Sequence, residues 1–370
     1  MGGFRVVYEY ANMLVGRGHE VAVVHPRHLR YAVLPEQLTL RNRILMAKRS
    51  FTELMKTPSI DWQPIDKRVR LLFVPSSDPR HIPDSDALFA TSWHTVRSVL
   101  ESPREKGKKC YLIQGYETWD GHKELVDATW RSNLRKVVIA KWLVELGGEL
   151  GCADLTYIPN AIDNDRYRLT QPIEGRSRQV AMLFSSTPIK GAADGIEAIR
   201  IARKRFPSLK AVFFGTSRHQ PWIPEWATYH RDPPQDFIVN EIYNKSCVFV
   251  APSWTEGSPL PPAEAARCGC AIVATDIGGF REYIQHGVTG LLSPCKDPQA
   301  LAENLCLLLE NEDLRVRLAR ACHDVISGLN WENSTDLLER FLLASIKGAA
   351  DVGEPQGSGV GATRFTERTS

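Results

Sequence analysis

The chain has 370 residues, 43% of them hydrophobic and 24% charged, and a formal net charge of +3 at pH 7. These values are ordinary for a soluble globular protein, and they exclude both wholesale disorder and a nucleic-acid partner bound through bulk charge. The sequence shows no apolar run of membrane-spanning length and no signal-peptide pattern, so we expect a cytosolic protein of about two domains.

In the first half, short apolar runs alternate with segments of helical spacing such as 4–15 and 141–150. The apolar runs predict strands at 20–25, 69–74, 87–90, 110–114 and 137–140. Short continuous apolar strands separated by helices are typical of parallel strands buried on both faces. The pattern therefore predicts a doubly wound α/β domain.

Two features of this half are irregular. The chain enters a helix directly after Gly2 and Gly3, whereas a doubly wound domain starts with a strand that is central in its sheet. We therefore expect the first strand of this domain to be missing from the sequence. The second feature is the basic, amphipathic segment 41–56. It fits either a solvated helix or a surface that docks on an anionic membrane or a lipid-linked acceptor.

The α/β pattern pauses at 160–175 and then restarts, which predicts a second Rossmann-like unit. Its predicted strands are 179–184, 211–214, 247–250, 271–274 and 290–292, and its predicted helices are 191–206, 234–245, 261–268, 298–311 and 314–326. The expected division is an acceptor-side domain (1–168), a nucleotide-sugar domain (169–330), a helix packing back across both (331–347) and a disordered tail (348–370).

The eight cysteines do not form a disulfide framework, because most of them lie inside apolar runs. Cys268 and Cys270 form the one close pair, without a second pair or a histidine at ligand spacing. We expect reduced, buried thiols in place of disulfides or a zinc site.

Segment 251–292 is the most informative part of the chain. It predicts a strand end, a turn rich in glycine and proline, and a helix that begins near Pro261. Ligands of open parallel sheets bind outside the carboxyl ends of the strands, where Glu256 in the turn and Glu264 on the helix would both lie. Carboxylates suit neighbouring sugar hydroxyls, although two glutamates at this spacing also fit a plain surface.

Backbone amides at the start of this helix would face a diphosphate. They belong to Gly257, Ser258 and Leu260, whereas Pro259 has no N–H to donate.

The segment contains E-G-x-x-L-P-P-x-E-A-x-x-x-G, followed by a strand and T-D-x-G-G. It resembles the E-x7-E segment of family 4 glycosyltransferases, and the resemblance covers residues 160–292 with gaps. It implies a GT-B fold, with two Rossmann-like domains facing each other across a cleft. It also implies transfer of a sugar from a nucleoside diphosphate to a glycan, lipid-linked or small acceptor, with retention of configuration, in cell-wall or polysaccharide synthesis.

The resemblance also implies roles for the donor-site residues. Glu264 would bind the ribose hydroxyls, and Glu256 would approach the donor sugar as a catalytic residue. Lys190 matches the family's diphosphate-binding lysine, but Ser185 stands where the family has an arginine. Losing one of two cations would weaken the hold on a leaving diphosphate.

Three glycines complete the expected donor site. Gly2 and Gly3 resemble the family's N-terminal glycine loop, whose backbone approaches the donor phosphates, and Gly215 is a further donor-binding candidate. Residues 158–167 resemble the P-N-G-[IV]-D signature at the domain junction, with alanine in place of the glycine.

The acceptor side has five candidates at the ends of two predicted strands: His94, Gln114, Tyr116, Glu117 and His122. The family often has a catalytically placed histidine where this chain has Gln114 and its neighbours. The short I-Q-x-Y-E match is similar to rhamnosyltransferases, which favours a deoxythymidine donor. A ribose held by Glu264 favours a UDP-, GDP- or ADP-sugar instead, and both alternatives stay open.

Rival interpretations were weighed against this one. Asp84-Ser85-Asp86 is a D-x-D triplet, the metal–diphosphate ligand of the GT-A fold, but it precedes a strand as an ordinary loop would. We expect neither a metal nor another cofactor. Two alternative functions are an inactive glycosyltransferase-like binding protein and a sugar-nucleotide epimerase, which shares this architecture and needs no acceptor.

Overall fold

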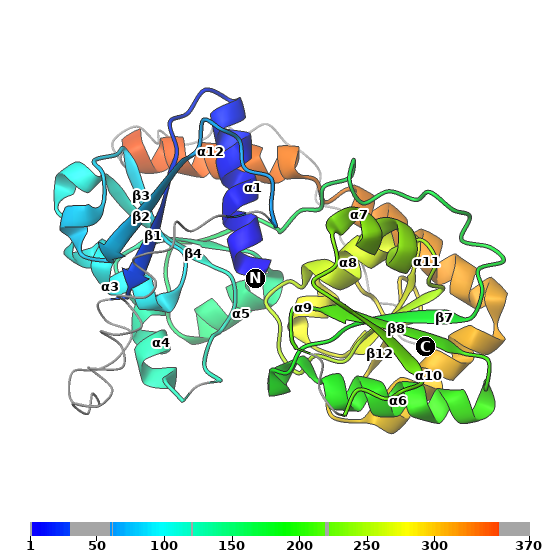
Figure 1. Ribbon diagram of the computed structural model, residues 1–370. Helices are drawn as coiled ribbons and strands as arrows, with labels where there is room; N and C mark the ends of the chain where they lie inside the picture. The colour runs from blue at the N-terminus through cyan, green and yellow to red at the C-terminus, as the bar shows by residue number, and fades with distance from the viewer. Residues whose placement is uncertain (1, 30–59, 61, 120, 219–221, 348–370) are drawn as a thin grey trace, which may run out of the picture.

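The computed structural model describes residues 2–29, 60, 62–119, 121–218 and 222–347. They form two α/β lobes, the first drawn in blue and cyan and the second in green to orange (Figure 1). The amphipathic segment 41–56 and the expected tail 348–370 lie outside the described residues.

All described strands of the first lobe pair in parallel, in two separate sheets. One has the order β1-β2 and the other β3-β4-β5-β6. The strands are β1 (Ala22–His28), β2 (Arg70–Ser76), β3 (Ala87–Ala90), β4 (Lys108–Ile113), β5 (Arg135–Val138) and β6 (Leu155–Tyr157). The helices are α1 (Gly2–Gly16), α3 (Trp93–Glu101), α4 (Lys123–Trp130) and α5 (Lys141–Glu149), with 3-10 turns η2 (Pro79–His81) and η3 (Arg104–Lys106).

The break between the two sheets has a definite place in the topology. In the doubly wound order 3-2-1-4-5-6, the first strand lies between the second and the fourth. If β1 and β2 are counted as the second and third strands and β3 as the fourth, the break falls at the position of that central strand.

The second lobe has one parallel sheet in the order β12-β11-β10-β7-β8-β9. Read from the opposite edge, this is the doubly wound order. Successive strands are added toward one edge as far as β9 and toward the other edge from β10 on, so the strand order reverses between β7 and β10. The strands are β7 (Gln179–Leu183), β8 (Lys210–Gly215), β9 (Ala227–Arg231), β10 (Val248–Ala251), β11 (Ala271–Thr275) and β12 (Leu291–Ser293). Their central members are fully buried, as the continuous apolar runs predict.

The helices of the second lobe are η4 (Pro188–Lys190), α6 (Ala192–Arg205), α7 (Gln235–Phe237), η5 (Ile238–Tyr243), α8 (Leu260–Arg267), α9 (Gly278–Arg281), α10 (Pro298–Glu310) and α11 (Glu312–Ser327). The expected helix over 234–245 is present as a continuous helical segment, but only α7 is α-helical and the chain then widens into the π-helix η5. In this wider turn Asn244 N–H donates to the carbonyl of Val239, five residues back. The Asn244 amide oxygen accepts from Thr170 N–H, which ties this turn to the segment between the lobes.

Several elements have no clear signal in the sequence: β6, β9, α3, α4 and α9. Helix α3 shows why such elements are missed. It spans only nine residues, and its buried apolar side chains are Trp93, Val96 and Val99, a stripe at three-residue intervals too short to establish a period.

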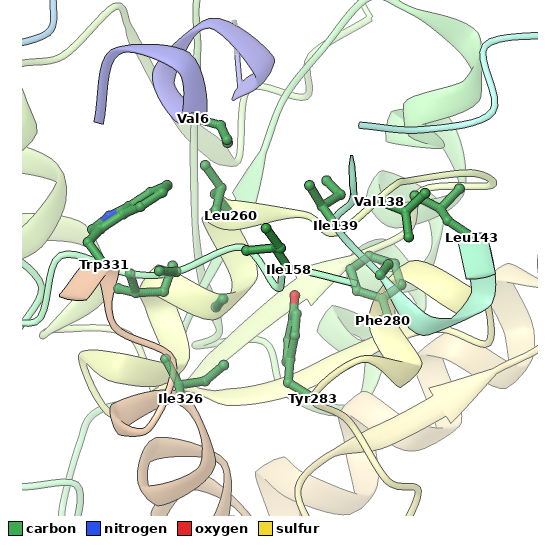
Figure 2. Packing of buried hydrophobic residues seen from close by; sticks show 14 of the residues in the cluster. Val6, Val138, Ile139, Leu143, Ile158, Leu260, Phe280, Tyr283, Ile326 and Trp331 are labelled. Carbon is green, nitrogen blue, oxygen red and sulfur yellow. The ribbon is translucent and has the colours of Figure 1, made fainter. Parts of the chain in front are cut away.

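One apolar cluster extends from the first lobe into the second. Figure 2 shows Ile158 of the segment between the lobes among Val6 of α1, Leu260 of α8 and Tyr283 of the second lobe. The last helix, α12 (Trp331–Lys347), leaves the second lobe and packs on α1 and β3 of the first (Figure 1). This cluster therefore joins the two lobes, and the second lobe also has a separate apolar cluster of its own.

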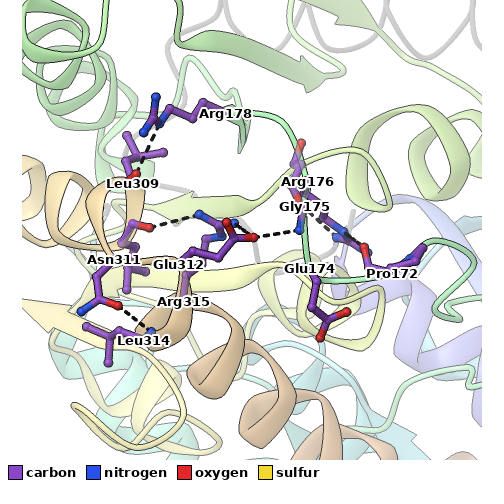
Figure 3. Close-up of polar contacts among 12 residues, drawn as sticks. Pro172, Glu174, Gly175, Arg176, Arg178, Leu309, Asn311, Glu312, Leu314 and Arg315 are labelled. Atoms are coloured by element: carbon purple, nitrogen blue, oxygen red, sulfur yellow. Dashed lines mark hydrogen bonds and ion pairs between the residues drawn. The ribbon is translucent and has the colours of Figure 1, made fainter.

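The segment between β6 and β7 lacks hydrophobic periodicity, and hydrogen bonds from its polar groups attach it to the second lobe (Figure 3). Arg176 donates to five backbone carbonyls, those of Gln171, Pro172, Tyr243, Ser246 and Cys268. Gly175 N–H donates to Glu312 Oε1 at 2.8 Å. The predicted domain boundary at 168 lies within this segment and stays a prediction.

Candidate active site

The candidate site lies at the point in the second lobe's sheet where the strand order reverses, between β7 and β10. Parallel sheets form a crevice at this point, outside the carboxyl ends of the strands on either side. Lys190 follows β7 and Glu256 follows β10, so both lie beyond the two strands that flank the reversal. The site that the sequence motif predicts therefore coincides with the one that the topology provides.

Lys190 and Glu256 form an ion pair at this crevice. The Lys190 ammonium lies 2.7 Å from Oε1 and 2.8 Å from Oε2 of Glu256. The pair is partly exposed, which leaves both groups accessible to a ligand. Each member of this ion pair can bind a ligand group in place of the other. The ammonium can bind a phosphate in place of the carboxylate, and the carboxylate can accept from a sugar hydroxyl in place of the ammonium.

Gly191 brings Lys190 to this position. Its φ is +61°, and a Cβ atom added here would lie 2.0 Å from the carbonyl oxygen of Pro252. Only glycine combines this left-handed conformation with so close an approach to the chain after β10. The backbone contact therefore sets how near the lysine comes to the Glu256 loop.

Glu264 is buried, with 4% of its surface exposed, and both of its oxygens are occupied. Tyr243 O–H donates to Oε2 at 3.1 Å, and Arg5 of α1 donates to Oε1 in a short ion pair. The same Arg5 Nη1 donates to Tyr167 Oη at 3.1 Å. The carboxylate that the sequence assigns to ribose is thus covered by a cation from the other lobe.

The tyrosines of this cluster stay protonated. Burial, followed by the negative charge of Glu264, raises the pKa of both Tyr167 and Tyr243. Tyr167 O–H donates in turn to Gln235 Oε1 at 2.8 Å. Although burial acts to lower the pKa of Arg5, the charge of Glu264 raises it, so this arginine is a fixed cation.

The loop after Glu256 is held against the first lobe. A Cβ atom at Gly257 would lie 1.9 Å from the carbonyl oxygen of Gln114, so the two backbones touch. Trp142 Nε1–H donates to the Gly257 carbonyl at 2.7 Å, and the Asn160 side chain donates to the Ser258 carbonyl at 3.2 Å. Leu260, the first residue of α8, is buried in the shared core.

The three predicted donor-site glycines are placed differently from one another. Gly2 and Gly3 form the first turn of α1, so the expectation of a glycine loop at this point is wrong. A Cβ atom at Gly3 would lie 3.3 Å from the Gln114 side-chain amide, so the helix starts beside an acceptor-side candidate. Gly215 ends β8, where its backbone approaches the carbonyl of Phe184; this contact is a packing constraint.

The acceptor-side candidates fall into separate groups. The His94 ring lies 3.8 Å from that of Trp93, and the His122 ring lies 5.7 Å from it. Tyr116 O–H instead donates to Asp127 at 2.6 Å, an acid that also accepts from Lys123.

Glu117 interacts electrostatically with Tyr111, whose pKa is raised first by burial and then by this charge. Gln114 lies beside both the start of α1 and the Glu256 loop.

The D-x-D triplet takes part in ordinary loop contacts. Lys106 Nζ lies 2.8 Å from Asp84, and Ser85 O–H donates to the Lys106 carbonyl. Within the described ranges, no group of three or more His, Cys, Asp or Glu side chains is arranged to hold a metal ion.

Sequence reasoning missed Arg5, Tyr167, Tyr243 and Gln235. Tyr167 is the last residue of the segment 158–167, which the resemblance places at the domain junction without a site role. Arg5 follows two glycines without any charge pattern, and it contacts a residue 259 positions away. No local signal identifies such a contact.

The parallel sheets of the two lobes and the helix that crosses between them define a GT-B fold. Solved structures support it at low sequence identity. The structure of Anabaena HepE in complex with UDP and glucose has a TM-score of 0.69 at 14% identity, covering 93% of this chain and 96% of that one. Sucrose-phosphate synthase from Thermosynechococcus elongatus has a TM-score of 0.64 at 13% identity, covering 87% and 97%.

Sequence comparison is more specific in the second lobe. Residues 179–311 match the family model described as "Glycosyl transferases group 1". The chain is 35% identical over 106 residues to a D-inositol 3-phosphate glycosyltransferase of Corynebacterium urealyticum (29% of this chain, 24% of that protein). It is 27% identical over 224 residues to the phosphatidyl-myo-inositol mannosyltransferase of Mycobacterium tuberculosis (57% of each).

The chain matches less than two thirds of the length of each of these relatives. None of the helices in the described part of the chain is both long and apolar enough to cross a membrane.

Proposed function

We propose that this protein transfers a sugar from a nucleoside diphosphate to an acceptor with retention of configuration. The observation that carries the proposal is the Lys190–Glu256 ion pair at the reversal point of the second sheet, inside the matched glycosyltransferase domain. The acid and the cation stand where a ligand of such a sheet binds.

In this proposal each group exchanges its partner when the donor binds. Lys190 leaves Glu256 for the diphosphate and stabilises the charge that develops on the leaving group. Glu256 accepts from donor-sugar hydroxyls, and Glu264 accepts from the ribose. The amides of Gly257, Ser258 and Leu260 face the diphosphate, and the proposal requires no metal or other cofactor.

The donor and the acceptor are proposed by chemical class. A solved neighbour contains UDP, and a carboxylate that holds both ribose hydroxyls needs a 2′-hydroxyl. We therefore place a ribonucleoside diphosphate sugar ahead of a deoxythymidine donor. Relatives named for phosphatidyl-inositol and for inositol phosphate favour a phosphate-bearing polyol, lipid-linked or free, as acceptor.

The test is thermal unfolding of the wild type and Glu264→Ala with UDP, GDP, ADP and dTDP. A ligand at a hundred times its dissociation constant stabilises the fold by about 2.7 kcal/mol, which raises Tm by several degrees. We expect one ribonucleoside diphosphate to raise Tm of the wild type and to lose this effect in Glu264→Ala. A well-folded wild type that responds to none of the four contradicts the proposal.

One structural observation favours a second candidate, an inactive binding protein: Glu264 is covered, and Ser185 brings no charge to the site. Glu256→Gln separates the two functions. An enzyme loses on the order of 100-fold or more in sugar transfer when a group that stabilises the transition state is removed. An inactive relative shows no transfer in the wild type, so the substitution has nothing to remove.

A further inference from the structure

The donor site as described so far supplies one cation to a group that carries more than one negative charge. Lys190 is the cation at the end of η4, and Ser185, which follows β7 on the same side, is uncharged. A leaving diphosphate is held best by several charge-assisted hydrogen bonds. The question is which other cation of the fold reaches the same crevice.

Arg5 reaches it from the first lobe. It lies in the first turns of α1 and pairs with Glu264, just as Lys190 pairs with Glu256. Its side chain is largely buried, and within the described residues its Nε–H is buried without a hydrogen-bond partner. A buried guanidinium with an unused donor is a costly arrangement unless another acceptor arrives.

The two ion pairs have the same construction. Glu256 lies in the loop before α8 and Glu264 lies within α8, and each holds a cation that comes from another part of the chain. In a nucleoside diphosphate sugar, the diphosphate lies between the ribose and the sugar. A donor whose ribose binds Glu264 and whose sugar binds Glu256 therefore places its diphosphate between the two carboxylates.

Resting on the function proposed above, we infer that Arg5 is the second diphosphate-binding cation of the site. In the ligand-free protein Arg5 is held on Glu264. When ribose hydroxyls take the carboxylate, the guanidinium turns to the neighbouring diphosphate and offers it a planar fork of N–H donors. Because Arg5 belongs to α1, the leaving group would then be held by both lobes at once.

The inference is tested by the affinity of wild type, Arg5→Ala and Arg5→Lys for UDP, GDP, ADP and dTDP and for the matching nucleosides, measured by calorimetry. For the diphosphate that binds, we expect Arg5→Ala to raise Kd on the order of 10- to 100-fold. Affinity for the nucleoside should not fall, because Glu264 has lost the cation that covers it. Arg5→Lys keeps the charge beside Glu264, so its Kd for the diphosphate should lie between those of the wild type and Arg5→Ala.

Arg200→Ala is the matched control, because Arg200 pairs with Glu197 on the exposed face of α6. It should bind like the wild type. If Arg5→Ala or Arg5→Lys binds the diphosphate as tightly as the wild type or more tightly, Arg5 only covers Glu264 and the inference is wrong. A wild type that binds no diphosphate contradicts the proposed function itself, which separates the two failures.

Discussion

At the scale of single residues, the site consists of acids that already hold cations. Glu256 holds Lys190 and Glu264 holds Arg5, so both of these carboxylates are paired. Pairing lowers the cost of keeping these charges partly buried until a ligand provides other partners. The E-x7-E spacing located both acids from the sequence, but it carried no information on Arg5, because that contact spans 259 positions.

Glu9, one helical turn beyond Arg5, gives a prediction at this scale. Burial raises the pKa of its carboxyl, although a hydrogen bond from Gln63 Nε2 at 2.6 Å acts in the opposite direction. The folded state therefore binds a proton at a pH at which the unfolded chain has lost it, and stability falls as pH rises through that range.

Glu9→Gln keeps an acceptor for Gln63 and removes the charge. We expect it to raise the free energy of unfolding at pH 7 and to leave it nearly unchanged at pH 3, where the wild-type carboxyl is almost fully protonated in both states. Urea unfolding at the two pH values measures this. An equal change at both pH values would show that the charge of Glu9 is not the cause.

At the scale of elements, the structure agrees with the sequence where the pattern is local and regular. Five strands of the second lobe's sheet, all except β9, and helices α6, α10 and α11 lie within a residue or two of their predicted bounds. Differences arise where a tertiary contact competes with the local pattern. The π-turn of η5 carries Asn244, which bonds to the segment between the lobes, and β6 is too short to show alternation.

Gly191 gives the prediction for this scale. Gly191→Ala places a methyl group against the carbonyl of Pro252 and also strains a left-handed backbone, so η4 must shift and take Lys190 with it. We expect a loss of stability larger than the roughly 1–2 kcal/mol of backbone strain alone, and a loss of the nucleotide-induced rise in Tm.

Gly151→Ala is the matched control, because Gly151 has φ +72° with no atom within 4 Å of the added carbon. Thermal unfolding of both variants with and without the nucleotide provides the comparison. Retention of the nucleotide effect in Gly191→Ala would mean that this turn does not position the lysine.

At the scale of the whole molecule, the two lobes are held together through their core and through α12. The Trp331 ring at the start of α12 meets the Tyr10 ring of α1 edge-on at 5.1 Å. Farther along α12, Asp336 and Glu339 pair with Arg17 at 2.7 and 2.8 Å. Ion pairs this close to the surface contribute little, so the aromatic contact is the stronger link.

Trp331→Ala is expected to cost about 3–5 kcal/mol, because it empties a buried position between the lobes. The free energy of unfolding is measured by urea denaturation monitored by far-UV circular dichroism, a signal that does not depend on tryptophan fluorescence. Leu343→Ala on the same helix, where the side chain is 45% exposed, should cost about 0.5 kcal/mol or less. Similar losses of stability in the two variants would indicate that the contact between Trp331 and Tyr10 does not stabilise the packing of α12 on the first lobe.

The sequence by itself determined the doubly wound pattern of each half, the position of the E-x7-E acids and the match of Lys190. These depend on spacings of a few residues, which hydrophobic period and motif record directly. The tertiary structure alone decided that Arg5 covers Glu264, that the Gly257 loop touches Gln114, and that α12 binds the first lobe. Such contacts join residues far apart in the chain, and their partners are fixed by how the two lobes pack together, which no local pattern encodes.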